Sequence, residues 1–309
     1  MCAPTYPSAP VTHTVRSIMF HLPVKPHKLP VLAFTIAREY ASGPPAPRVP
    51  EPMVMDEQDS VAEYHQVGAR TQAPIYELCA RGIHELVPHG GTVLDLGSGS
   101  ARCLAHLARR RPDLRIIGVD LSDRMIETGR AMLAADGLDG RVELRKGDIR
   151  DLGDVAPESV DLVSSNQSLH HLPTTEALAG CLREVARVRE RTGAAVWIFD
   201  EARVRHGKSY GGFLTSFLDL TPALKRDALA SERAAFTPRE LIEQLDDAGL
   251  RDLRHAAMRF FPAYQVHWAP RRDAAAVNGA PLVDAQLPKG TEFDTWMFVR
   301  MFPGMPRRR

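Results

Sequence analysis

The chain has 309 residues, which is enough for one large domain or two small ones, and 44% of them are hydrophobic, as is typical of a globular protein. Its 39 Lys and Arg residues nearly balance its 38 Asp and Glu residues, so the overall charge predicts no nucleic-acid partner and no lipid-surface partner. The longest apolar runs fall short of the roughly 20 residues that a bilayer helix needs, which predicts no membrane span.

Two further sequence patterns bear on the cellular compartment of the protein. The four cysteines lack the spacing of metal ligands or of a disulfide framework, which favours reduced thiols and no metal site: Cys2, Cys79, Cys103 and Cys181. The first 30 residues contain no continuous apolar run after a basic end, so we expect no cleaved secretory signal. Both patterns favour the cytoplasm.

The N-terminal part divides into two segments of different composition. Prolines crowd residues 1–52, which predicts an arm with one short helix at residues 30–40, stopped by Gly43 and Pro44. Residues 53–90 carry apolar residues at helical spacing, which predicts a helical lid that leads into the main domain.

From residue 91 the pattern alternates between strands and helices. We expect five strands, at residues 92–96, 115–121, 142–148, 160–166 and 194–200. Helices are expected between them, at residues 100–111, 123–136 and 175–190. Such alternation predicts a doubly wound parallel sheet with helices on both faces and right-handed crossovers.

The C-terminal part completes the domain at residues 91–309. A helix is expected after Thr237, where Pro238 occupies the first helical position, Glu240 forms a capping box and Gly249 ends the helix. Two strand-like runs follow, at residues 253–261 and 292–302. Two segments lie outside this plan and are predicted to be insertions: residues 204–235 and 262–291.

The turn at Gly97-Ser98-Gly99 indicates a ligand site. It follows the first strand, where a parallel sheet binds ligands, and glycine lets the backbone approach a ligand closely. Asp120 ends the second strand, where an acid accepts the hydroxyls of a ribose. A dinucleotide fingerprint needs a small residue where Arg102 stands, and Asp95 suits a cationic ligand better than a pyrophosphate. The pattern therefore favours an adenosine-bearing cation.

At residues 53–250 the sequence resembles the class I S-adenosylmethionine-dependent methyltransferases. The similar motifs are VLDLGSGSA (93–101), GVDLSDRMI (118–126), GDI (147–149) and DLVSSNQSLHHL (161–172). The one departure is Ala101, where the family has a third glycine. The resemblance implies a Rossmann-like sheet, mostly parallel with an antiparallel last strand, in the order 3-2-1-4-5-7-6.

The resemblance also implies S-adenosyl-L-methionine as the cofactor and S-adenosyl-L-homocysteine as the product. Asp95, Asn166 and the turn would hold the methionine part, and Asp120 would hold the ribose. The full set implied to contact the cofactor is Tyr64, Asp95, Gly97, Ser98, Gly99, Asp120, Leu121, Met125, Gly147, Asp148, Ile149 and Asn166. For Leu121, Met125 and Ile149, ordinary core packing is an alternative.

Methyl transfer from a sulfonium is an in-line displacement in which the enzyme mainly aligns the reactants. His170 and His171 follow the fourth strand and are candidates for a general base, with a role in the pocket wall as the alternative. Arg203 is a candidate for binding an acceptor anion, and Tyr210 for lining the acceptor pocket.

The added segments predict an enclosed pocket, which favours a small-molecule acceptor, as in specialised metabolism, methylated on O, N or C. Three alternatives stay open: methylation of a peptide or protein carboxyl group, an NAD-dependent oxidoreductase, and a non-catalytic protein that binds an adenosyl ligand. The proline-rich arm is compatible with a homodimer.

Overall fold

The computed structural model describes residues 26–51, 71–153, 159–217, 220–273, 281–284 and 287–305. Its centre is a seven-stranded sheet in the order β3-β2-β1-β4-β5-β7-β6, in which the pairs β5–β7 and β7–β6 are antiparallel and the rest parallel. The strands are β1 (Thr92–Leu96), β2 (Arg115–Asp120), β3 (Val142–Lys146), β4 (Leu162–Asn166), β5 (Ala195–Glu201), β6 (Arg254–Ala257) and β7 (Tyr264–Ala269). The strand order that the resemblance implied is confirmed.

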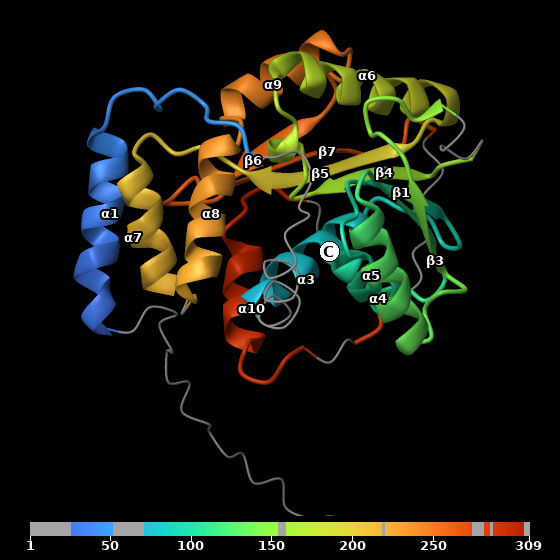
Figure 1. Ribbon diagram of the computed structural model, residues 1–309, viewed down its shortest axis with the longest axis horizontal. Helices are drawn as coiled ribbons and strands as arrows, with labels where there is room; N and C mark the ends of the chain where they lie inside the picture. Colours follow the sequence, from blue (N-terminus) through green and yellow to red (C-terminus); the bar gives the residue numbers. More distant parts are fainter. Residues whose placement is uncertain are drawn as a thin grey trace, which may run out of the picture.

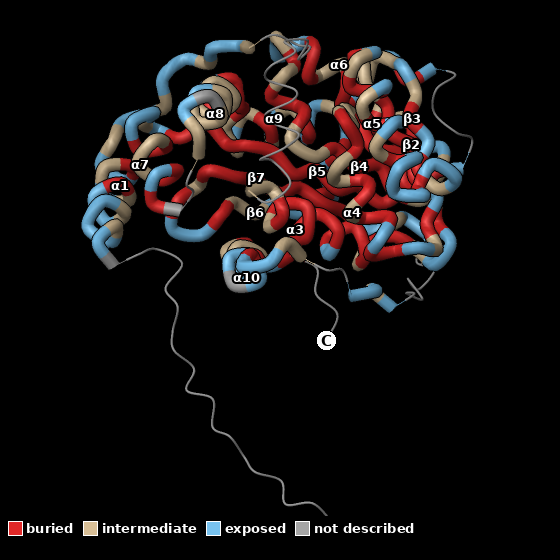
Figure 2. Tube along the Cα trace, turned by 60° about the horizontal axis from the view of Figure 1, so that its bottom comes forward, coloured by how far each residue is buried: buried red, intermediate tan, exposed pale blue. Residues whose placement is uncertain are grey.

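Helices cover both faces of the sheet (Figure 1). One face carries α3 (Ala73–His84), α4 (Arg102–Arg110), α5 (Asp123–Ala135) and α10 (Glu292–Arg300). The other face carries α6 (Thr175–Thr192) and α9 (Pro238–Asp247). Two hydrophobic clusters fill the two interfaces, and the strands between them are buried, as Figure 2 shows. None of the helices in the described ranges combines the length and apolar character that crossing a bilayer requires.

The helix after Thr237 has the expected cap. The Thr237 hydroxyl accepts from the Glu240 backbone N–H, and the Glu240 carboxylate accepts from the Thr237 backbone N–H. Ser122 and Thr174 cap α5 and α6 in the same way with their hydroxyls. These caps satisfy backbone donors that a helix start leaves unpaired, and they explain why the helix starts are readable in the sequence.

The last strand lies elsewhere than expected. Residues 292–302 were predicted as a strand because the run is rich in apolar residues, but Glu292–Arg300 is the helix α10, which packs on α3. Acids in its first turn and Arg300 in its last turn suit the helix macrodipole. The strand is instead Tyr264–Ala269, within a segment that we took for an insertion, and all six of its residues are buried.

A third group of helices lies beyond one end of the sheet, on the left in Figure 1. It consists of α1 (Leu29–Ala41), α7 (Gly207–Phe217) and α8 (Pro222–Ala234). The buried Glu39 carboxylate of α1 accepts from the backbone N–H groups of Arg205 and His206, just before α7 begins. A carboxylate at a helix N-terminus is favourable, so Glu39 joins the arm to the first insertion.

Residues 43–51 continue from α1 across the short 3-10 helix η3 (Leu169–His171). The Arg48 guanidinium donates to the carbonyl oxygens of His170, Leu172, Pro173 and Ala234. It also stacks on the Phe236 ring, at 4.0 Å from the ring centre. This fixed segment brings Glu51 to the end of β4.

Candidate active site

The glycine turn after β1 forms one wall of a pocket at the carboxyl ends of β1, β2 and β4. Gly97 has a φ of +75°, and a side chain there would meet Ser168 Oγ at 1.7 Å. Gly99 has a φ of +51°, and its N–H donates to Asp120 Oδ2 at 2.7 Å. Ala101, which replaces the third glycine, also has a positive φ of 60°. The turn thus holds a backbone shape that glycine adopts most easily.

Asp95 is buried under this turn at the end of β1. Its Oδ1 accepts from Ser164 Oγ at 2.6 Å and from Asn166 Nδ2 at 2.8 Å. Burial raises the pKa of the Asp95 carboxyl to about 7, although both hydrogen bonds oppose the shift. The Asn166 amide oxygen, which we expected to face the methionine ammonium, accepts from Trp197 Nε1 at 3.1 Å.

The two other acids of the motifs also have partners within the protein. Asp120 lines the pocket and accepts from the backbone N–H groups of Gly99 and Ser122, and burial raises its pKa. Asp148 lines the pocket too, but its carboxylate is ion-paired with Arg150 at 2.6 Å, which lowers its pKa. An adenine amino group at Asp148 would therefore share an acceptor with Arg150.

The structure brings most of the expected cofactor residues together in this pocket. Those that line it are Gly97, Ser98, Gly99, Asp120, Leu121, Met125, Gly147, Asp148, Ile149 and Asn166. Asp95 lies behind the turn and contacts the pocket through Asn166. Tyr64 lies outside the described residues.

A second pocket adjoins the first and shares Ile75, Gln167 and His171 with it. Its far wall comes from α7 and α8, through residues that include Tyr210, Leu214, Leu224, Asp227 and Ala228. The predicted insertion at residues 204–235 therefore builds a cavity next to the glycine turn.

Comparison with known proteins agrees with this geometry. Residues 93–193 match a family model described as "Methyltransferase domain". A demethylmenaquinone methyltransferase from Roseiflexus sp. (strain RS-1) is 29% identical over 54% of this chain and 71% of its own length. A trans-aconitate 2-methyltransferase from Deinococcus radiodurans is 35% identical over 40% of this chain and 44% of its own length.

Solved structures show the same fold. The S-adenosylmethionine-dependent methyltransferase SibL, in its apo form, shares 19% identity and a TM-score of 0.51, over 78% of this chain and 70% of that one. Residues 93–193 therefore form a methyltransferase domain, and its fold is the one that SibL shares. SibL depends on S-adenosylmethionine, which is the cofactor that the motifs of this chain implied.

In this methyltransferase, carboxylates surround the buried His170 on η3. Its Nδ1 lies 2.5 Å from Asp200 Oδ1 and 3.2 Å from Glu201 Oε2, while Nε2 lies 3.4 Å from Glu51 Oε1. Burial alone would lower the pKa of the His170 imidazole, but the facing carboxylates of Asp200 and Glu201 raise it to about 10. The carboxylates therefore favour a positive charge at this position, and a protonated imidazole does not suit a general base.

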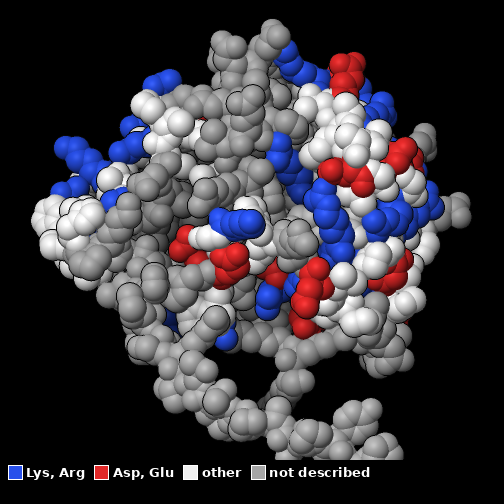
Figure 3. All heavy atoms as spheres, turned by 90° about the horizontal axis from the view of Figure 1, so that it is seen from below, with Lys and Arg blue, Asp and Glu red and all other residues white. Residues whose placement is uncertain are grey.

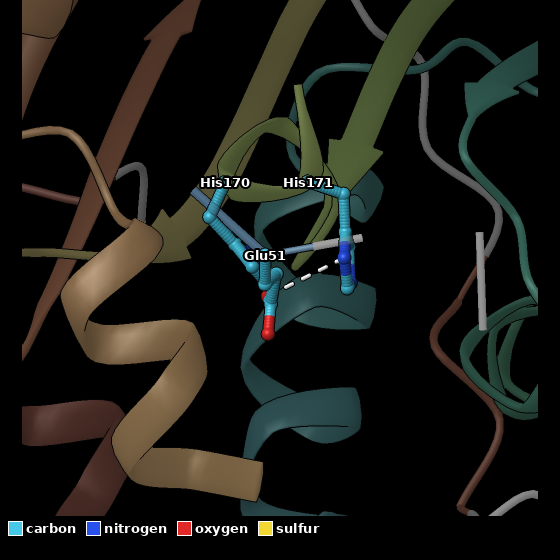
Figure 4. A group of neighbouring side chains, drawn as sticks. All are labelled: Glu51, His170 and His171. Carbon is cyan, nitrogen blue, oxygen red and sulfur yellow. Dashed lines mark ion pairs between the residues drawn. The ribbon is translucent and has the colours of Figure 1, made fainter. Parts of the chain in front are cut away.

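His171 lies between the two pockets and lines both. Its Nδ1 is 3.3 Å from the same Glu51 oxygen that faces His170. Figure 4 shows Glu51, which comes from the arm, meeting the two histidines of η3. Of the histidine pair, His171 is therefore the member that borders both pockets.

The other two expected catalytic residues have different positions. Tyr210 on α7 is buried and lines the second pocket, as expected. Arg203 does not line either pocket: its guanidinium donates to the Ala235 carbonyl at 2.7 Å and to Glu240 Oε1 at 2.6 Å. The expectation that Arg203 binds an acceptor anion is therefore wrong, because the guanidinium fastens α8 to α9 instead.

The sequence analysis missed two acids that line the second pocket and a third, Glu51, that contacts the histidine pair beside it. Glu201 ends β5, and its Oε1 accepts from Gln167 Nε2 at 2.7 Å. Asp227 of α8 lines the pocket, and burial raises its pKa. Glu51 comes from the arm. The end of β5 was a readable signal for Glu201, whereas no local pattern indicates Glu51 or Asp227.

Proposed function

We propose that this protein transfers the methyl group of S-adenosylmethionine to a small molecule bound in the second pocket. The observation that carries the proposal is the shared wall of Ile75, Gln167 and His171, through which the two pockets adjoin. An in-line displacement needs the acceptor atom next to the methyl carbon, on the side away from the sulfur. Adjoining pockets allow that alignment.

For the cofactor we propose the roles that the motifs implied. Asp95 and the turn at Gly97–Gly99 bind the cationic methionine part, and Asp120 binds the ribose. Leu121, Met125 and Ile149 enclose the adenine beside Gly147 and Asp148. The Asn166 amide acts mainly through Asp95, because it donates to Asp95 Oδ1 and its oxygen accepts from Trp197.

The charge of the second pocket limits which classes of acceptor can bind there. Among the described residues that line it, the charged ones are Glu201 and Asp227 together with the histidine pair, and neither lysine nor arginine is present. A carboxylate or phosphate would meet like charges there. The acceptor that fits is a neutral or cationic small molecule with an apolar part against Leu214, Leu220 and Leu224.

The same charges disfavour methylation of a peptide carboxyl group. That alternative needed an arginine anchor, and Arg203 faces Glu240 and Ala235 instead. We propose that the acceptor is activated at His171. Either the imidazole ring itself or a group bound to the ring promotes loss of the acceptor's proton. Acceptor oxygen, nitrogen and carbon all fit this arrangement, as does a role in specialised metabolism.

The first test is calorimetric titration with S-adenosylmethionine, S-adenosylhomocysteine and NAD. We expect both adenosyl ligands to bind and NAD not to bind, and we expect Asp120→Ala to weaken binding at least about tenfold through lost hydrogen bonds. Binding of NAD alone would support the oxidoreductase alternative. Cofactor binding without turnover across a screen of neutral and cationic acceptors would support the non-catalytic alternative.

The second test separates the two pockets. Asp227→Asn is expected to raise the KM of a cationic acceptor about tenfold and to leave the Kd of S-adenosylmethionine unchanged, because Asp227 lines only the second pocket. Asp246→Asn, on the exposed side of α9, is the matched control. An equal change in both constants would argue against two separate pockets.

We also propose a cytoplasmic location, supported by the free thiols of Cys79, Cys103 and Cys181.

A further inference from the structure

Three side-chain atoms from two distant segments converge at the junction of the two pockets (Figure 4). They are Glu51 Oε1 of the arm, His170 Nε2 and His171 Nδ1. The histidine rings are adjacent, with centres 4.3 Å apart. The three residues each offer one ligand atom such that these atoms lie within 4.8 Å of one another.

The spacing matches the edges of a metal coordination shell. Glu51 Oε1 is 3.4 Å from His170 Nε2 and 3.3 Å from His171 Nδ1. Ligands about 2.0–2.1 Å from a tetrahedral metal ion lie about 3.3–3.4 Å from each other. Direct hydrogen bonds are commonly shorter, at about 2.7–3.2 Å. Within the described ranges, the buried Glu51 Oε1 accepts no hydrogen bond.

The surrounding residues hold these atoms in place. Asp200 Oδ1 lies 2.5 Å from His170 Nδ1, so the carboxylate fixes the ring and directs Nε2 toward Glu51. A carboxylate or carbonyl on the second nitrogen is the usual support of a metal-binding histidine. Glu51 is held by Ser231, which hydrogen-bonds its carboxylate, and by the anchoring of the arm through Arg48.

Charge gives a second, independent argument. Three carboxylates gather around the His170 ring: Glu51, Asp200 and Glu201. Their direct ion pairs in the described chain are with the two histidines, so three acidic groups face two imidazoles in a buried place. Glu201 Oε2 is buried there and has no hydrogen-bond partner in the described chain. A divalent cation would offset this excess.

We propose that Glu51, His170 and His171 bind a divalent transition-metal ion. Two imidazoles and one carboxylate suit Zn²⁺, Mn²⁺ or Fe²⁺ better than Mg²⁺ or Ca²⁺, which prefer oxygen ligands. The three ligands leave further coordination positions, and the second pocket borders both histidines and Glu201. No spacing pattern indicates this site, because Glu51 is far from the histidine pair in the chain.

The role of the ion rests on the proposed function. An acceptor hydroxyl bound to the ion has a lower pKa and releases its proton to solvent. An oxygen lone pair then forms the new O–C bond while the C–S bond of S-adenosylmethionine breaks and its electron pair goes to sulfur. The metal ion keeps its oxidation state. This role favours a hydroxyl acceptor for the reaction.

The test measures metal binding directly. Chelator-treated protein is dialysed against Zn²⁺ or Mn²⁺ and its metal content determined, and Co²⁺ serves as a spectroscopic probe of the ligands. We expect one ion per chain. Glu51→Gln and His171→Ala should each weaken binding more than tenfold, and Asp200→Asn about 10–100-fold as a positioning residue. Circular dichroism and the melting temperature verify that each variant folds.

The matched control is His255→Ala. His255 belongs to the other histidine pair, with Nδ1 2.7 Å from His267 Nδ1, and no carboxylate forms an ion pair with either ring within the described ranges. This variant should bind metal like the wild type. The proposal is overturned if the wild type binds no stoichiometric ion, or if folded Glu51→Gln and His171→Ala bind it unchanged.

The experiments distinguish a failure of the metal-site proposal from a failure of the proposed function. Methyl transfer that persists unchanged after complete metal removal would overturn the metal's role and leave the methyltransferase proposal intact. Absence of S-adenosylmethionine binding in calorimetry would overturn the proposed function, while metal content would still report on the site by itself.

Discussion

At the scale of single residues, Asp95 makes cofactor binding depend on pH. Its pKa is about 7 in the folded protein against an ordinary value of 3.8, so folding favours the protonated form and that stability is lost as pH rises through about 7. A cationic methionine group favours the ionised form. The Kd of S-adenosylmethionine should therefore fall about tenfold between about pH 6 and about pH 8. Calorimetry across this range measures it.

The control for that prediction is Asp95→Asn. The amide has a similar shape but does not ionise, so its Kd should be weaker at about pH 8 and nearly constant with pH. An unchanged pH slope in this variant would assign the titration to another group.

A separate prediction concerns His171. His171→Ala should lower turnover more than tenfold while changing cofactor affinity little.

Single residues also show what a sequence can and cannot reveal. Asp95, Asp120 and the glycines were predictable because their roles depend on local backbone shape at strand ends. Arg203 was misassigned because its partners, Ala235 and Glu240, lie on other elements. Glu51 was not predictable, since only the folded arm brings it to His170.

At the scale of elements, the turn after β1 predicts different effects for two glycines. Gly97→Ala meets both a positive φ and Ser168 Oγ at 1.7 Å, whereas Gly90→Ala has a φ of +69° and open space. Gly90→Ala should cost about 1 kcal/mol of unfolding free energy, from backbone strain alone. Gly97→Ala should cost at least about 2 kcal/mol and weaken cofactor binding, because Ser168 must move. Denaturant unfolding and calorimetry compare the two, and equal losses would contradict the steric argument.

Elements were predictable where period and caps agreed. The capping box at Thr237 marked the start of α9, and the regular alternation of strand-like and helix-like segments identified β1 to β5. The exchange between the last strand and α10 arose because short apolar runs fit both periods. β7 does alternate apolar and polar residues, with Gln265 and His267 between aromatic and aliphatic neighbours, but all six of its residues are buried. Its strand signal was therefore readable in the segment that was taken for an insertion.

At the scale of the whole molecule, the arm connects parts that are far apart in sequence. Glu39 contacts the segment before α7, Arg48 contacts carbonyl oxygens of η3 and of the end of α8, and Glu51 contacts the histidine pair. The charged surface gives no such organisation: Figure 3 shows Lys and Arg interspersed with Asp and Glu on the right of the face drawn. The arm is thus the long-range element on which the acceptor side depends.

Arg48→Lys tests that dependence. A lysine keeps the charge but cannot reach four carbonyl oxygens or stack flat on Phe236, so we expect a loss of about 1–3 kcal/mol of unfolding free energy and weaker retention of Glu51. Arg38→Lys, whose guanidinium lies over the exposed Phe34 ring, is the matched control and should cost under about 0.5 kcal/mol. Denaturant unfolding measures both. In the same Arg48→Lys protein the KM of the acceptor should rise more than the Kd of S-adenosylmethionine, since Arg48 holds the backbone of Leu172 in the first pocket but both the backbone of His170 and the segment that carries Glu51 on the acceptor side. A change confined to the cofactor Kd would place the arm over the wrong pocket.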